Sequence, residues 1–381
     1  MIATYSKLPG TTASIFSVMS QLANDYNAIN LSQGFPDYDC DPVLIDLVTA
    51  AMKAGHNQYA PMAGIPLLRE LVVDKVNRQY GSDYHPDTEV TITSGGIQAI
   101  CTALTACIKP GDEVIIFEPA YDAYAPLIRS LGGLVKAYEM APPDYSIDWE
   151  MVRKLFTANT KMIILNTPHN PTGTVLGAQD IQSLIKLVKN TDVLVLSDEV
   201  YEHLVFDGEK HISLASYPEL KERSFITASF GKMLHATGWR MGYCLAPKQL
   251  MAEFRKIHQF NVFSINTPMQ VAIANYIKDP ATYLQLADFF QEKRDYFRKM
   301  LSETKFKLLP CKGSYFQCVR FDHFSDDADT VMAKRLVTEV GVASIPVSAL
   351  YMRNTDYSVL RFCFAKKRET LEQSVERLMK L

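Results

Sequence analysis

Residues 161–201 read KMIILNTPHNPTGTVLGAQDIQSLIKLVKNTDVLVLSDEVY. Two short apolar runs, KMIIL and VLVLS, enclose a stretch in which apolar residues recur at helical spacing, at Ile181, Leu184, Ile185 and Val188. A strand, a covering helix and a second strand in this order form the unit from which parallel sheets are built. The segment therefore predicts an α/β fold.

The same alternation continues on both sides of this segment, from about residue 89 to residue 246. The β-rich runs are TEVTIT, EVIIFEPAY, LVKAYEM, KMIILN, VLVLSD, SFITAS and RMGYCLAP. We expect them to form one largely parallel sheet with helices on both faces, because buried parallel strands have nearly continuous apolar sequences of this kind.

The sequence pattern changes after about residue 285. A charged helical pattern is followed by FKLLP, YFQCVRF, VASIPVS and VLRFCFA, which polar and glycine-containing turns separate. This pattern predicts a smaller α+β domain. We expect residues 1–40 to form an N-terminal arm and part of the small domain, residues 41–280 the large domain and residues 281–381 the rest of the small domain. A long helix near residues 275–300 would join the two.

Composition narrows the choice of partners. The chain has 381 residues with 39 basic and 42 acidic side chains, so its net charge of -3 favours neither nucleic acid nor an anionic membrane as partner. Its apolar stretches are shorter than the ~18 residues of a membrane span, and its start lacks the pattern of a signal peptide. The seven cysteines are scattered, which favours neither disulfides nor a metal site. We expect a cytoplasmic protein that binds small molecules.

Residue types suited to catalysis or ligand binding follow the predicted strands, at the edge where open α/β sheets bind ligands. Ser94-Gly95-Gly96 precedes a helical stretch whose first N–H groups suit a phosphate, although such a pair of glycines also forms ordinary tight turns. Tyr121 follows EVIIFEP and either stacks on a flat ligand or belongs to the core.

Three further strand ends carry polar groups. NTPHNPTG, at residues 166–173, holds two asparagine amides between prolines that restrict the backbone, and here His169 is expected to be a positioning residue. Asp198 ends an apolar strand, where a carboxylate either caps a loop or needs a positive partner. Lys232 lies in SFGKMLHATGWR among small and apolar neighbours that favour its neutral, nucleophilic form, whereas most loop lysines lie on the surface.

Taken together, these motifs resemble those of class I aminotransferases, which are pyridoxal-phosphate enzymes of fold type I. Five motifs occur in the order and spacing of that family: SGG before a helix, PAYDAY, NTPHNPTG, SDEVY, and SFGK with an arginine eight residues after the lysine. The resemblance covers nearly the whole chain. LSQGFPDY, NQYAPMAGIPLLR and VLRFC are similar to the branch of kynurenine and glutamine aminotransferases, and above all to bacterial methionine aminotransferases. The resemblance implies a seven-stranded, mostly parallel sheet in the large domain.

The resemblance also implies a role for each matching residue. Lys232 would bind pyridoxal 5'-phosphate covalently and move protons, Asp198 would pair with the protonated pyridine nitrogen, and Tyr201 would contact the ring oxygen. The other residues expected to bind the cofactor are Gly96, Ile97, Tyr121, Asn170, Ser229, Arg240 and, from the neighbouring subunit of a homodimer, Tyr59.

Arg361 would bind the substrate α-carboxylate as a two-pronged pair, assisted by Asn170 and the backbone of Gly34. The expected substrate-binding set also contains Phe16, Tyr124 and Phe263. Phe16 stands where kynurenine aminotransferases generally carry tryptophan, and Ser264 follows Phe263, so the sequence favours methionine, an aromatic or a glutamine-like amino acid as donor.

The function expected from these roles is transfer of an amino group from an L-amino acid to a 2-oxo acid. A pyridoxal-phosphate β-lyase acting on cysteine conjugates is the nearest alternative, because elimination begins with the same proton abstraction. A nucleotide-binding dehydrogenase is a remote alternative that only the β/α alternation suggests. The first predicted strand is not followed by G-x-G-x-x-G.

Overall fold

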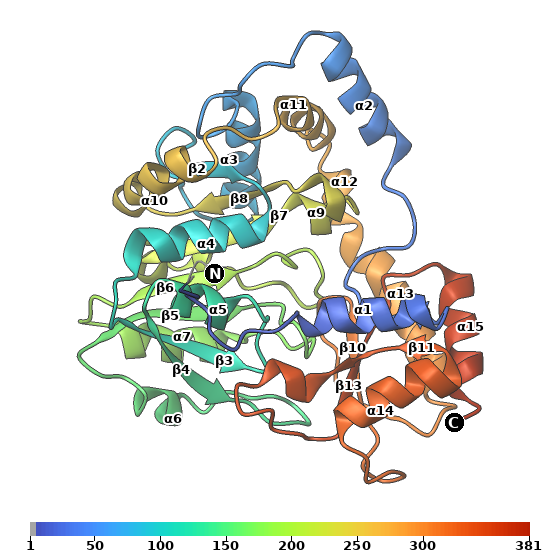
Figure 1. Cartoon of the computed structure of the whole chain (residues 1–381). Coiled ribbons are helices and arrows are strands. Elements are labelled where there is room, and N and C mark those ends of the chain that lie inside the picture. The colour runs from blue at the N-terminus through green and yellow to red at the C-terminus, as the bar shows by residue number, and fades with distance from the viewer. Residues whose placement is uncertain (1–4) are drawn as a thin grey trace.

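The computed structural model describes residues 5–381 and contains the expected α/β sheet (Figure 1). Seven strands pair in the order β2-β8-β7-β6-β5-β3-β4, and β8 alone runs antiparallel to both of its neighbours. All seven β-rich runs of the sequence form these strands, which confirms the predicted fold class. Their bounds are β2 Val90–Thr93, β3 Glu113–Glu118, β4 Leu134–Glu139, β5 Thr160–Asn166, β6 Leu194–Asp198, β7 Ser224–Ser229 and β8 Gly242–Leu245.

Apolar residues cover both faces of this sheet. Along β3, Ile115 belongs to one buried apolar cluster and Ile116 to the other, because successive side chains of a strand point to opposite faces. The helices of this part are α2 Pro42–Lys53, α3 Pro66–Tyr80, α4 Gly96–Cys107, α5 Tyr124–Ser130, α6 Trp149–Arg153, α7 Ala178–Val188, α8 Pro218–Lys221, α9 Phe230–Met233, α10 Lys248–Asn261 and α11 Thr267–Tyr276.

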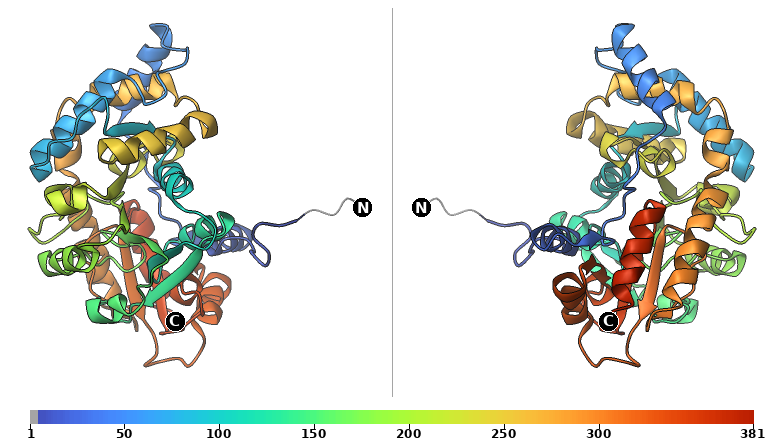
Figure 2. Two further views of the ribbon diagram at one scale, coloured as in Figure 1. Left: turned by 90° about the vertical axis from the view of Figure 1, so that its left-hand side faces the viewer. Right: turned by 90° about the vertical axis from the view of Figure 1, so that its right-hand side faces the viewer.

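The C-terminal part, orange to red in Figure 1, forms a second sheet in the order β12-β13-β10-β9. The N-terminal helix α1 (Ile15–Asp25) lies beside it, and β1 (Ile29–Asn30) pairs in parallel with β11 (Val342–Ala343). Residues 5–14, ahead of α1, extend away from the body of the molecule (Figure 2). The remaining elements are α12 Ala281–Leu284, α13 Leu286–Leu301, β9 Lys307–Leu308, β10 Phe316–Arg320, α14 Asp329–Arg335, β12 Ile345–Pro346, β13 Val359–Cys363 and α15 Arg368–Leu378.

The stretch near residues 275–300 differs from the single long helix that the sequence predicts. The structure divides it into the end of α11, the short α12 and the long α13. The first break coincides with Pro280, which lacks an N–H group and clashes with a preceding helical turn. Among residues 5–381, no helix is long and apolar enough to cross a membrane.

Candidate functional site

A cavity of about 420 Å³ lies beyond the carboxyl ends of the parallel strands. It brings together residues from the N-terminal segment, the large sheet and the C-terminal sheet. All but three of the predicted site residues line it, namely Phe16, Gly34, Gly96, Ile97, Tyr121, Asn170, Asp198, Tyr201, Ser229, Lys232, Arg240 and Arg361. The fold thus gathers at one place side chains that are up to 345 positions apart in the sequence.

Lys232 is presented by α9, the single turn of helix that follows β7. Its ε-amino group donates hydrogen bonds to the Gly34 carbonyl at 3.0 Å and to the Tyr315 hydroxyl at 2.7 Å. Burial disfavours the ammonium form and lowers the pKa of Lys232 to about 8. At pH 7 roughly a tenth of the amine is therefore neutral and nucleophilic, far more than for an exposed lysine.

The N-terminus of α4 forms one end of the cavity. Gly95, the N-cap, has φ +78°, and a Cβ there would lie 2.7 Å from Nη2 of Arg240, so only glycine allows the guanidinium so close to the helix. The first N–H groups of a helix have no partners within it and carry a partial positive charge. Together with Arg240 and the Ser229 hydroxyl, they form an end of the cavity that suits a phosphate.

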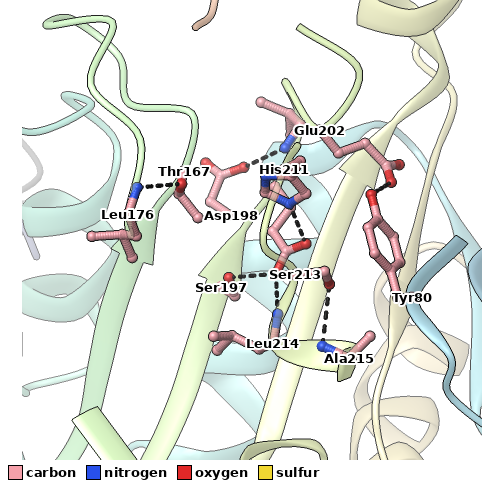
Figure 3. Close-up of polar contacts among 12 residues, drawn as sticks. Tyr80, Thr167, Leu176, Ser197, Asp198, Glu202, His211, Ser213, Leu214 and Ala215 are labelled. Carbon is pink, nitrogen blue, oxygen red and sulfur yellow. Dashed lines mark hydrogen bonds and ion pairs between the residues drawn. The ribbon is translucent and has the colours of Figure 1, made fainter. Parts of the chain in front are cut away.

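Asp198 lies at the end of β6 and is only 4% exposed. Its carboxylate accepts a hydrogen bond from the Tyr124 hydroxyl at 2.5 Å. A second, longer hydrogen bond comes from the Val200 N–H at 3.4 Å, and Figure 3 shows the Asp198 carboxylate at the end of its strand. Among the described residues it has no salt-bridge partner. Burial therefore raises the pKa of Asp198 to about 6, and a cationic group in the cavity would restore its charge.

The NTPHNPTG loop connects Asp198 with the C-terminal sheet. The side-chain amide of Asn166 makes two hydrogen bonds: its NH₂ group donates to the Asp198 backbone carbonyl at 2.8 Å, and its Oδ1 accepts from the Asn170 backbone N–H at 2.8 Å. His169 is buried, bonds Thr172 at 2.8 Å and lies outside the cavity lining. Burial lowers the pKa of His169 to about 3, so it stays neutral and positions the loop.

Arg361, on β13, brings a buried positive charge to the other side of the cavity. Its guanidinium donates to Asn170 Oδ1 at 2.7 Å and to the Ser32 carbonyl at 2.5 Å, and it lies 3.9 Å from the ring centre of Phe316 and 5.0 Å from that of Phe16. Arg361 is 1% exposed, and its Nε finds no hydrogen-bond partner within residues 5–381. A buried arginine without an anion suits a ligand carboxylate.

These features fit pyridoxal 5'-phosphate. The N-terminus of α4 with Arg240 suits the phosphate, and Asp198 in the same cavity lacks a salt-bridge partner among the described residues, which a protonated pyridine nitrogen would supply. The ring of Tyr121 lines the space between, and Lys232 lies within the same cavity. Burial raises the pKa of Tyr121 to about 12, so its ring stays neutral.

Three predicted site residues do not line the cavity. Tyr124 is 3% exposed and lies behind Asp198, to which it donates its hydrogen bond. In this structure its hydroxyl therefore contacts the Asp198 carboxylate and does not reach the cavity lining. Tyr59 and Phe263 lie on the surface, 82% and 54% exposed, with ring centres 5.2 Å apart.

Several residues near the cavity were not singled out from the sequence. Asp122 lines the cavity and accepts a hydrogen bond from the Ser14 hydroxyl, and Phe316 packs against Arg361. Tyr315 contacts Lys232 from outside the lining. Asp122 stands next to Tyr121 in PAYDAY, which was the one available signal, whereas Tyr315 and Phe316 follow an ordinary glycine-serine turn.

Comparisons with known proteins identify relatives over nearly the whole length of the chain. The family model "Aminotransferase class I and II" matches residues 26–378. The methionine aminotransferase of Escherichia coli is 43% identical over 377 residues, covering 99% of this chain and 98% of the relative. Kynurenine–oxoglutarate transaminase 1 of Rattus norvegicus is 31% identical, covering 98% of this chain and 97% of the relative. The crystal structure of E. coli YbdL, for which a methionine aminotransferase function was identified, superimposes with a TM-score of 0.98, 42% identity and complete coverage of both chains.

Proposed function

The chain belongs to the class I and II aminotransferase family, and on that premise we propose that it binds pyridoxal 5'-phosphate in the described cavity and transfers amino groups from a neutral amino acid such as methionine. Membership confirms the resemblance predicted from the motifs and the assignment as an aminotransferase. These relatives lend no support to a β-lyase or a dehydrogenase. The observation that carries the cofactor proposal is the pairing of an uncompensated Asp198 with a partly neutral Lys232 in one cavity.

Each residue has a chemical task in this proposal. Bound pyridoxal phosphate supplies an aldehyde that accepts the amino group and a protonated ring that takes up the electron pair left when the Cα–H bond breaks. Asp198 keeps the ring nitrogen protonated, and Arg361 binds the substrate carboxylate and so orients Cα. Lys232, once free, takes the Cα proton and returns it elsewhere as general base and acid.

The substrate side of the cavity supports a neutral donor side chain. Phe16 presents an apolar ring there, and Asp122 adds a carboxylate held by Ser14. An acidic substrate side chain would meet the like charge of Asp122 at short range. Methionine, phenylalanine, tyrosine and glutamine avoid this repulsion, so we propose donors of this kind.

We further propose a homodimer in a reducing cytoplasm. Phe260, Tyr59 and Phe263 are aromatic side chains exposed by 86%, 82% and 54%, and large exposed rings are enriched where proteins associate. A second copy of the chain that covers them would bring its Tyr59 toward the phosphate end of the cavity. The seven cysteines are all free thiols, as suits a reducing compartment.

The first test is the variant Lys232→Ala, with the exposed Lys248→Ala as matched control. We expect wild-type protein and the control to absorb in the near-visible region and, after borohydride reduction, to carry the cofactor on Lys232 by peptide mass spectrometry. Lys232→Ala should lose the band, the adduct and transamination of methionine. A Lys232→Ala protein with full activity would refute the proposal.

A further inference from the structure

Three groups from distant parts of the chain form a closed triangle of hydrogen bonds. The ε-amino group of Lys232 lies 2.7 Å from the Tyr315 hydroxyl and 3.0 Å from the Gly34 carbonyl, and the Tyr315 hydroxyl lies 2.5 Å from the same carbonyl. Tyr315 immediately precedes β10, the neighbour of the strand that carries Arg361. The triangle thus links the reactive lysine to the C-terminal sheet.

The direction of each hydrogen bond in the triangle is fixed. A carbonyl oxygen only accepts, so Gly34 accepts from both of its neighbours. Tyr315 has a single O–H proton, which it donates to Gly34, and its oxygen must therefore accept from Lys232. Both contacts of Lys232 consequently use its N–H groups.

This arrangement leaves one position on the nitrogen without a partner in the triangle. A neutral amine has two N–H groups and one lone pair, so the lone pair is the position left over. An ammonium group has a third N–H there instead. Because Lys232 lines the cavity, this position is available for a proton transfer with a bound substrate.

The Tyr315 ring is itself held firmly. It is 1% exposed and packs edge to face against Tyr201, with ring centres 5.1 Å apart, and against Phe316 at 4.9 Å. The Phe290 ring also packs against Tyr315, with ring centres 5.8 Å apart. A hydroxyl on a ring with so little freedom can define the position of a flexible lysine side chain.

We propose that Tyr315 is a positioning residue that holds the free ε-amine of Lys232 so that its one unbonded position faces the substrate. The inference rests on the proposed function. In the proton transfer, the Cα–H bond breaks, its electron pair stays with the substrate and cofactor, and the proton becomes the third N–H of Lys232. The two N–H groups bound by Tyr315 and Gly34 remain in place throughout.

The test is Tyr315→Phe, which removes the hydroxyl and keeps the ring. One hydrogen bond contributes about 1–1.5 kcal/mol, so we expect kcat to fall by about 10-fold, with the KM of the amino donor changed by less than about twofold. The deuterium isotope effect on kcat with an α-deuterated donor should rise, because proton transfer becomes more rate-limiting. A loss of folded protein alone would not raise this isotope effect.

A second readout does not depend on activity. In protein freed of cofactor, the rate at which Lys232 is acylated can be followed against pH by peptide mass spectrometry. Loss of an acceptor destabilises the ammonium form, so the midpoint of the pH profile should move to lower pH in Tyr315→Phe. Tyr351→Phe is the matched control, since Tyr351 is equally buried but donates to the Met140 carbonyl at 2.8 Å, away from the cavity.

The outcomes separate the inference from the function on which it rests. If borohydride fails to trap the cofactor on Lys232 in the wild-type enzyme, the proposed function is wrong. If trapping succeeds and Tyr315→Phe matches Tyr351→Phe in kcat, isotope effect and acylation profile, the role of Tyr315 is overturned. Should Tyr315→Phe not fold, 3,5-difluorotyrosine at position 315 keeps the shape and weakens the acceptor. An unchanged isotope effect and acylation profile would then overturn the role.

Discussion

Asp198 and Glu202 are carboxylates four positions apart, both nearly inaccessible, in opposite electrostatic situations (Figure 3). Glu202 accepts hydrogen bonds from Lys75 at 2.6 Å, Tyr243 at 2.8 Å and Tyr80 at 2.7 Å. Burial favours its neutral form, but the charge of Lys75 and these hydrogen bonds outweigh that effect and lower the pKa of Glu202 below its usual range. For Asp198 burial prevails, and its pKa rises to about 6.

The difference distinguishes a structural carboxylate from a functional one. The partners of Glu202 all lie within the chain, and Glu199 is similarly paired with His211 at 2.9 Å and Ser197 at 2.8 Å. Asp198 has hydrogen bonds but no cation. A protein tolerates such a buried charge where a bound ligand supplies the compensating positive charge. A buried carboxylate without a cationic partner therefore marks a candidate site.

The largest expected effect comes from removing Lys75, the cation that is paired with Glu202. Lys75→Met leaves Glu202 as an uncompensated buried charge, and such changes cost about 3–5 kcal/mol of unfolding free energy. Urea denaturation would measure this loss. The double variant Lys75→Met with Glu202→Gln should recover part of it, because no charge remains unpaired. If the single variant were as stable as the wild type, the account of Glu202 as a structural carboxylate would be wrong.

The second predicted effect is a loss of activity without a loss of stability. Asp198→Asn removes a charge that has no salt-bridge partner among residues 5–381, so the protein without cofactor should unfold at the same or a higher urea concentration than the wild type. Its kcat should fall on the order of 10²–10³-fold, as when a preorganised electrostatic partner is removed from a catalytic site. Paired urea and kinetic measurements on Asp198→Asn and Lys75→Met test the contrast directly. A strongly destabilised but active Asp198→Asn enzyme would contradict it.

The sequence predicted the sheet and most of the cavity because both depend on local patterns. Each strand is a short apolar run, and Asp198 and Lys232 stand directly at strand ends, which converge at one edge of the sheet. In SDEVYEH, however, nothing local tells which of the other two carboxylates, Glu199 or Glu202, receives Lys75 from α3. That choice depends on packing between distant elements.

The roles of Tyr124 and Tyr315 were beyond prediction for the same reason. Tyr124 was expected at the substrate, but α5 turns its hydroxyl toward β6. Lys232 meets Tyr315, 83 positions away in the sequence, and Gly34, 198 positions away, only in the folded chain. Contacts of this kind depend on the fold as a whole and leave no periodic pattern in the sequence.

The smallest effect concerns the hydrogen bond that partly compensates Asp198. The Tyr124 hydroxyl donates to the carboxylate and so favours its ionised form, which means that Tyr124→Phe should raise the pKa of Asp198 further. Activity requires ionised Asp198 and is lost as pH falls through this pKa. The acidic limb of kcat against pH should therefore move to higher pH, by about 1–2 units for a bond of about 1.5–3 kcal/mol to a charged group.

At pH 9 and above, Tyr124→Phe should retain most of its activity, because Asp198 is ionised there with or without the hydroxyl. Tyr145→Phe is the matched control, since the buried Tyr145 hydroxyl has no hydrogen-bond partner and its removal should leave the limb in place. An acidic limb that coincides in the two variants would show that Tyr124 does not tune the carboxylate. A shift confined to Tyr124→Phe would show that the Tyr124 hydroxyl stabilises the ionised form of Asp198. The hydrogen bond would then supply part of this stabilisation, and the bound cofactor would supply the remainder.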